Sequence, residues 1–234
     1  MIVQQTKLEE SPLKNRLAGG VIVLFFIGVI ALVAYGIVET RQRLILVQTH
    51  QDLKWIGIAL HRYHDEHGHF PPVVELDQSG SPRHSWRAII QPHLAAHVKT
   101  SDNFNAYDFR QKWDSDINSD AVQRHRFGDH WFQFLAVVGP HAAWSKEGTR
   151  KLSDITDGTS NTILVIGIRD TGIGWNEPRD AEYDGKRLTI NGQPLKSPQN
   201  IFVLFADGSV RSGVYSEAIT PLLTIDAGDQ APDW

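Results

Sequence analysis

The segment from Leu17 to Val38 places the strongest constraint on how this chain can fold. It reads LAGGVIVLFFIGVIALVAYGIV and contains no charged residue and no Ser, Thr, Asn, Gln or His. As an α-helix, its 22 residues reach about 33 Å, which matches the hydrocarbon core of a bilayer. The alternative is a cleaved secretory signal, whose apolar region is shorter and ends at a small-residue cleavage site. Because this run is longer and continues into Glu39-Thr40-Arg41, the sequence predicts a retained transmembrane helix.

The positive-inside rule does not orient this segment, because three basic residues lie on each side of it. The flanks differ in size, with 16 residues before the segment and 196 after it, and this favours a signal-anchor topology. We expect a cytoplasmic tail over residues 1–16, a span through the cytoplasmic (inner) membrane over residues 17–38, and an ectodomain outside over residues 39–234. The lipid bilayer is then the expected partner of residues 17–38. The basic residues are Lys7, Lys14, Arg16, Arg41, Arg43 and Lys54.

Composition excludes several classes of function. The chain has 23 Lys+Arg against 27 Asp+Glu, a net charge of −4, which argues against nucleic acid as a partner. It has no cysteine, so disulfides, thiolate metal sites and cysteine nucleophiles are all excluded. Hydrophobic residues make up 41% of the chain, which is enough to build a buried core in the ectodomain.

A helical pattern continues beyond the membrane segment. Apolar residues recur at helical spacing, while Asp52 falls outside their stripe. Gly68 followed by Pro71-Pro72 predicts the end of the helix. We therefore expect one long helix to about His67, half in the membrane and half in the ectodomain. The stripe consists of Leu46, Leu53, Ile56, Leu60 and Tyr63.

After Pro72 the signals change from helix to strand. Three short runs are rich in apolar, β-branched and aromatic residues and are bounded by turn-forming residues. These runs are Trp131–Val138, Thr162–Ile168 and Ile201–Ala206. No ten-residue helical pattern alternates with them, so a parallel doubly wound sheet is not expected. The predicted fold class is α+β, with the long N-terminal helix packed on an antiparallel β-sheet.

Two dipeptides predict hairpin turns in this sheet. Asn191-Gly192 tolerates the positive φ angles of a type I′ turn, and Pro194 restricts the returning strand to a sheet edge. Asp207-Gly208 is the second candidate turn.

Five ordered motifs resemble the planctomycete pilin-like family of unknown function, whose members are often labelled type II secretion pseudopilin-like. This resemblance implies a pilin-like architecture and a structural or assembly role at the bacterial cell envelope, without catalysis. It also implies other pilin-like subunits or envelope proteins as partners. The motifs are LKWIGIALHRYHDEHGHFPP (Leu53–Pro72), SWR (Ser85–Arg87), SDITDGTSNTILV (Ser153–Val165), WNEP (Trp175–Pro178) and FADGSVR (Phe205–Arg211).

Departures from the family pattern support an alternative function. Family members carry a prepilin cleavage site followed by an acidic residue that pairs with the neighbouring subunit's amino terminus. Here Gly19-Gly20 is followed by Val21–Phe25, and the apolar run contains no acid. Thr49 stands where a family cysteine precedes the first motif, and Gly167 stands where members commonly have an acid. The alternative is a membrane-tethered ectodomain that binds a ligand or ion and does not polymerise.

Four histidines near the predicted helix end are a candidate metal site. Imidazoles at helical spacing can bind Zn²⁺ or Cu²⁺, but the segment from His64 to His67 contains no HExxH motif. We favour hydrogen-bonded or solvated histidines over a metal site. The four residues are His61, His64, His67 and His69.

The segment Asp114–Asp120 is a candidate calcium loop, because it places oxygen-bearing side chains at alternate positions. Ser119 stands where an EF-hand has its glycine, and His125 stands where the closing acid is needed. We favour a solvated turn after Trp113, and a calcium loop of another kind remains the alternative.

A cluster of polar residues could hold a nucleophile, with Ser160 activated by His141. No GxSxG elbow is present, and the neighbours Asp154, Asp157 and Asn161 are also typical of turns. We favour a turn, and we predict no enzyme activity, no catalytic, cofactor-binding or metal-binding residues, and no cofactor.

Overall fold

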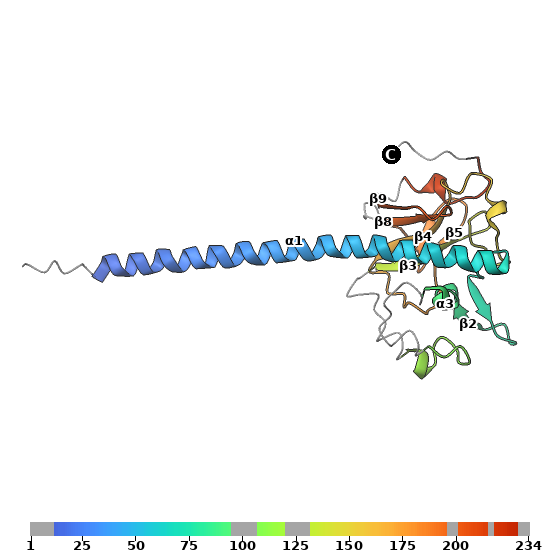
Figure 1. Ribbon diagram of the computed structural model, residues 1–234, viewed down its shortest axis with the longest axis horizontal. Helices are drawn as coiled ribbons and strands as arrows, with labels where there is room; N and C mark the ends of the chain where they lie inside the picture. Colours follow the sequence, from blue (N-terminus) through green and yellow to red (C-terminus); the bar gives the residue numbers. More distant parts are fainter. Residues whose placement is uncertain (1–11, 95–106, 120–131, 196–200, 215–217, 229–234) are drawn as a thin grey trace, which may run out of the picture. The chain divides into compact units, whose positions relative to one another are not determined.

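The computed structural model describes residues 12–94, 107–119, 132–195, 201–214 and 218–228, with side chains from residue 24 onward. The chain divides into two compact units, Met1–Leu46 and Val47–Trp234. One helix, α1 (Pro12–His67), contributes to both units (Figure 1). The second unit contains the strands and the shorter helices, so the fold is α+β as predicted.

The first unit contains the apolar part of α1. Every residue from Leu24 to Val38 is exposed. By length and composition, the described residues contain one candidate membrane span or signal anchor, and it lies in α1. A long run of exposed apolar side chains is unfavourable in water, so this surface needs lipid or protein around it.

The last part of α1 forms the centre of the second unit. Leu53, Ile56 and Leu60 are fully buried, which confirms this part of the predicted stripe. The helix ends as predicted at Gly68, whose φ is 77° and whose amide donates to the carbonyl of His64 at 2.7 Å. Glycine is favoured there because other residues adopt positive φ with strain.

The predicted stripe is wrong at its N-terminal end, where Leu46 is exposed. Among the residues from 24 onward, the first buried position of α1 is Thr49, almost one turn later. Asp52, which the pattern placed outside the stripe, is half-buried, and desolvation raises its pKa to about 6.

Within the described residues, seven strands form one mixed sheet in the order β7-β6-β5-β3-β4-β8-β9. Paired neighbours are antiparallel except β3 and β5, which are parallel with Val137 opposite Ala181. The expectation of a purely antiparallel sheet is therefore wrong. Residues 170–180 cause the difference, because they carry the chain from β4 to the opposite edge of β3. The strands are β3 (Phe132–Val138), β4 (Ile163–Arg169), β5 (Ala181–Tyr183), β6 (Leu188–Ile190), β7 (Gln193–Pro194), β8 (Ile201–Phe205) and β9 (Val210–Val214).

The three predicted core strands correspond to β3, β4 and β8, although Trp131 lies outside the described residues. All five residues of β8 are buried, which shows that the sheet is covered on both faces there. The face away from α1 packs on the segment around the 3-10 helix η3 (Thr220–Leu222), whose side chains Ile219, Leu222 and Leu223 join its hydrophobic cluster.

Two glycines allow α1 to approach the sheet closely. A Cβ at Gly167 of β4 would lie 3.2 Å from the Cβ of Phe202 and 3.4 Å from Leu53 on α1. A Cβ at Gly57 of α1 would lie 2.9 Å from the Cδ1 of Leu204. Helix and sheet therefore meet where both surfaces lack bulk, which close packing of the core requires.

Both predicted hairpin turns are confirmed. Asn191 and Gly192 have φ angles of 53° and 73°, as a type I′ turn needs, and Pro194 lies in β7 at the sheet edge. Gly208 joins β8 to β9 with a φ of 82°.

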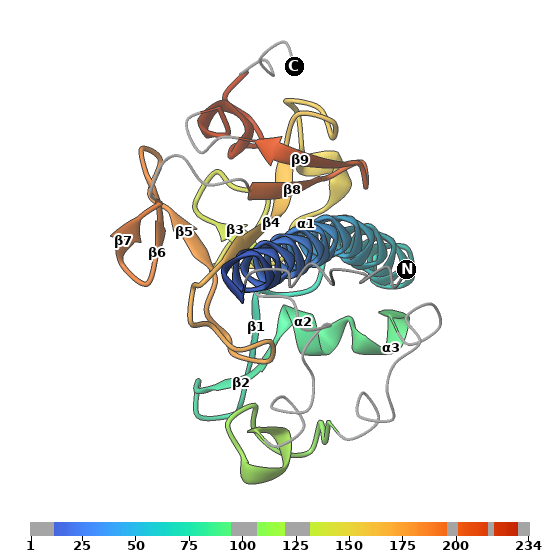
Figure 2. The same cartoon turned by 90° about the vertical axis from the view of Figure 1, so that its left-hand side faces the viewer.

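A smaller layer lies on the other side of α1 from β8 and β9 (Figure 2). It contains a two-stranded antiparallel sheet and two short helices, and sequence reasoning predicted none of them. A further 3-10 helix, η2, covers Leu152–Asp154. The elements of the layer are β1 (Val74–Leu76), β2 (Pro82–Ser85), α2 (Trp86–Ile89) and α3 (Gln91–Leu94).

We predict that Gly139→Ala destabilises the ectodomain by about 1–3 kcal/mol, because the new Cβ would overlap the backbone carbonyl of Tyr183, which cannot move freely. Thermal unfolding of the full-length chain in detergent micelles measures this. Gly148→Ala is the matched control, since a Cβ there meets none of the described residues within 4 Å. Equal melting temperatures for the two variants would contradict the described approach of β3 to Tyr183.

Candidate functional site

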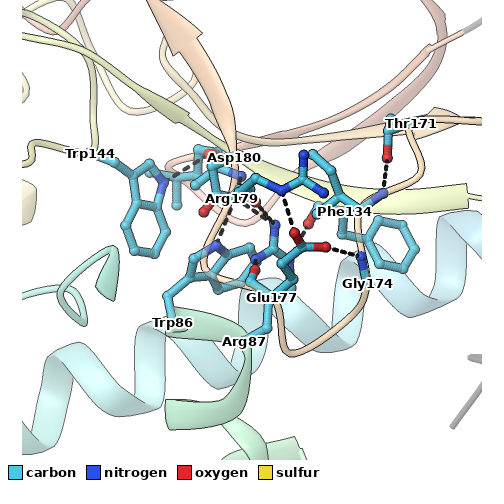
Figure 3. A network of polar contacts seen from close by, with 12 residues as sticks. Trp86, Arg87, Phe134, Trp144, Thr171, Gly174, Glu177, Arg179 and Asp180 are labelled. Carbon is cyan, nitrogen blue, oxygen red and sulfur yellow. Dashed lines mark hydrogen bonds and ion pairs between the residues drawn. The ribbon is translucent and has the colours of Figure 1, made fainter. Parts of the chain in front are cut away.

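Arg87 is a buried arginine at the start of α2. Its side chain is 1% exposed and donates through Nε to the carbonyl of Phe134 at 2.6 Å. It also donates to the carbonyls of Glu177 at 3.2 Å and Arg179 at 2.9 Å. Its guanidinium reaches Asp180 Oδ1 at 2.6 Å (Figure 3). A buried charge is tolerated only when it is paired and bonded in this way.

Asp180 is the partner of Arg87, and its side chain is 3% exposed. Its Oδ1 also accepts from the indole Nε1 of Trp86 at 3.1 Å and from the amide of Ala136 at 2.8 Å. Its Oδ2 is buried and has no hydrogen-bond partner among the described residues. Burial raises the pKa of Asp180 to about 6, and Arg87 and the other donors oppose that rise.

The ion pair replaces a neighbouring strand along part of β3. The carbonyl of Phe134 and the amide of Ala136 point to the same side of β3, because backbone groups alternate in direction along a strand. On that side β5 pairs only from Val137 onward. Arg87 and Asp180 therefore satisfy two backbone groups that none of the described strands reaches.

A groove lies beside this ion pair, and we call it the Asp180 groove. Its volume is about 310 Å³, and its lining includes Val73, Val74, Val138, Lys146, Asp180 and Asn191. An adjoining cleft of about 330 Å³ shares Val138, Lys146 and Glu182 with it. Both volumes fall at the lower end of the range for small-ligand pockets.

The charged groups along the groove are paired with one another. Lys146 forms an ion pair with Glu182 at 2.5 Å. Arg179 contacts Glu177 and donates to the side-chain oxygen of Asn191 at 2.7 Å. The groove thus combines an apolar wall with neutralised charges. The carboxylate of Asp180 is covered beside it, since that side chain is 3% exposed.

The four histidines of the candidate metal site have different surroundings and do not converge on one point. His61 has a buried Nε2 without a described partner near Gly208, whereas His64 Nε2 accepts from the amide of Leu152 at 3.2 Å. His67 and His69 bond the nearby carbonyls of Tyr63 and Phe70 through Nδ1. Among the described residues, no three His, Asp or Glu side chains are placed to hold one metal ion.

The predicted calcium loop extends to Asp120, which lies outside the described residues. Within the described part, Trp113 and Asp114 form the expected turn, and Asp114 and Asp116 are exposed, whereas Asn118 is fully buried. Its Oδ1 accepts from the amide of Asp108 at 2.8 Å, and its Nδ2 donates to the carbonyl of Lys112 at 2.8 Å. This side chain therefore stabilises its own loop.

The predicted nucleophile and base have different surroundings. Ser160 is exposed, and Nδ1 of His141 lies 3.1 Å from Asp226. Asp157 accepts from the amides of Ala227 and Gly228 at 2.9 and 2.8 Å, as a turn-stabilising residue does.

Comparison with known proteins gives similarity to a family described as a protein of unknown function (DUF1559) over residues 47–138. The match begins at Val47, where the second compact unit also begins. It includes Arg87 and stops before Asp180. No curated protein and no solved structure matches the chain.

Sequence reasoning identified SWR and WNEP as motifs but missed the contact between them. Arg87 belongs to the first, and the carbonyl that it bonds at Glu177 belongs to the second. The available signal in the sequence was the position of Arg87 next to Trp86 in the SWR motif, because a charged residue beside a tryptophan can be buried with it. The groove itself gave no sequence signal.

We predict that Arg87→Met lowers the free energy of unfolding by about 3–5 kcal/mol, because Asp180 would be left as a buried unpaired charge. Chemical unfolding of the full-length chain in micelles measures the loss. Arg83→Met is the matched control, since Arg83 is partly exposed and lies 3.5 Å from Glu75 and 3.0 Å from the carbonyl of Phe109, so about 1 kcal/mol is expected. Equal losses for the two variants would contradict this assignment.

His84 provides a pH-dependent contribution to stability. Its Nε2 bonds the carbonyl of Phe109 at 2.9 Å, so Nε2 carries the hydrogen, and Nδ1 accepts from the hydroxyl of Tyr107 at 2.8 Å. Burial lowers the pKa of His84 below 6.5, although the Phe109 carbonyl opposes the shift. The folded state therefore binds fewer protons than the unfolded state, and stability falls as the pH drops through about 6.5.

We expect unfolding free energies measured between pH 7.5 and pH 5 to decrease more steeply for the wild type than for His84→Gln. The comparison isolates His84, because the raised pKa values of Asp52 and Asp180 act in the opposite direction in both proteins. Identical slopes would show that His84 does not titrate differently on folding.

Proposed function

We propose that this protein is a single-pass membrane protein of the bacterial cell envelope with a non-catalytic ectodomain in a structural or assembly role. Residues 17–38 span the cytoplasmic membrane, the N-terminus lies in the cytoplasm, and the ectodomain lies outside. Other pilin-like subunits or envelope proteins are the partners of the ectodomain.

One observation carries this proposal. A single helix, α1, has an exposed apolar segment from Leu24 to Val38 and then supplies the buried residues Leu53, Ile56 and Leu60 of the ectodomain. The anchor and the core are thus built from one element. This supports a protein whose ectodomain is fixed at the membrane rather than released from it.

A second candidate function is a tethered ectodomain that binds a ligand and does not polymerise. Two observations favour it. The membrane segment has no acidic residue to pair with a neighbouring subunit, and the ectodomain has the Asp180 groove, whose volume is about 310 Å³ and whose wall includes Val73, Val74 and Val138.

Anchoring is tested by the intact mass of the protein extracted from membranes. We expect the full-length mass, and a mass lacking the first 20 or so residues would contradict a retained anchor. Val29→Lys should reduce membrane insertion, because a lysine at the span centre costs roughly 3 kcal/mol. Val47→Lys is the control outside the span, at an exposed position, and should insert normally.

Electron microscopy of the membrane-extracted protein separates the two candidates. Filaments support the structural role, and their presence would exclude the non-polymerising alternative. A uniform monomer without filaments at high concentration would favour the tethered binding ectodomain.

A further inference from the structure

We propose that the Asp180 groove binds an extended peptide segment of a partner protein, which adds as a strand to the edge of β1 that faces away from β2. This proposal rests on the second candidate function, the tethered binding ectodomain. Its occupant is a neutral peptide with small apolar side chains at alternate positions.

The edge of β1 supplies the first argument. Among the described residues β1 pairs only with β2. The amide of Trp86 donates to the carbonyl of Val73 at 3.0 Å, so Val73 points its backbone toward β2. Because direction alternates along a strand, the N–H and C=O of Val74 point away from β2. Val73 and Val74 also line the groove, so an added strand would lie within it.

The charge beside the groove supplies the second argument. Arg87 already neutralises the buried Asp180 carboxylate at 2.6 Å. A neutral peptide backbone therefore fits better than a cation, which would add a second positive charge near Arg87.

The remaining lining matches a neutral peptide. Val73, Val74, Val138 and Pro178 give an apolar surface for alternate side chains. The charges of Lys146 and Glu182 are paired with each other, so no net charge is left for a strongly charged ligand.

The test uses the full-length chain in detergent micelles and the capped peptide acetyl-Val-Thr-Val-Thr-Val-amide as the probe. We expect saturable binding by nuclear magnetic resonance titration, together with at least tenfold slower hydrogen exchange of the Val74 amide. The same peptide with methylated backbone nitrogens lacks the donors and should bind at least tenfold more weakly. No binding of the probe, or equal binding of the methylated peptide, would overturn the proposal.

Val74→Trp fills the groove and should abolish peptide binding. Leu76→Trp is the matched control, because Leu76 lies on the same strand, is 54% exposed and does not line the groove. Melting temperatures establish that both variants fold. If Val74→Trp cannot fold, the wild-type chain is titrated with the peptide and with butylammonium in competition. We expect the peptide to bind more tightly, and tighter binding of the cation would overturn the neutral-peptide assignment.

Failure of the peptide test is distinguishable from failure of the anchoring proposal. Sedimentation with lipid vesicles tests membrane anchoring independently of peptide binding in the groove. A protein that sediments with vesicles and does not bind the probe retains its anchor and loses only this peptide site.

Discussion

The buried ion pair between Arg87 and Asp180 is the interaction on which the arrangement of the ectodomain depends. Two buried charges are costly to desolvate, and this pair is stable because nearly every donor and acceptor around it is used. Arg87 bonds the carbonyls of Phe134, Glu177 and Arg179 as well as the carboxylate. It thereby holds residues 177–180, which directly precede β5, beside β3. The positions of β5 and of the groove wall at Asp180 follow from this contact.

The other motifs have structural explanations of the same kind. The amides of Ala206 and Asp207 donate to the carbonyls of Thr162 and Thr159, so the DGS turn and the TSNT turn are bonded to each other. The carboxylate of Asp157 also accepts hydrogen bonds from Thr224, Ala227 and Gly228, and so holds residues 224–228 against the TSNT turn. The polar residues of these turns therefore satisfy backbone groups.

Local patterns predicted much of the fold. Glycines, which tolerate positive φ, identified the end of α1 and both hairpin turns. Runs of apolar residues identified β3, β4 and β8. The parallel pairing of β3 with β5 could not be predicted, because β5 has three residues and no periodic pattern. The candidate site was equally inaccessible, since Arg87 and Asp180 are 93 positions apart and only tertiary structure brings them together. Leu46 was misplaced because helical periodicity does not show where packing begins.

The central claim is that the ion pair takes the place of a strand along β3. Hydrogen exchange of the Ala136 amide tests it most directly, because that amide donates to Asp180 Oδ1 rather than to a neighbouring strand. The account predicts that Ala136 exchanges as slowly as the interior amides of β3 on either side of it, at a rate limited by global unfolding. Exchange of Ala136 several orders of magnitude faster than Leu135 and Val137 would show that the carboxylate does not hold this edge, and would contradict the account.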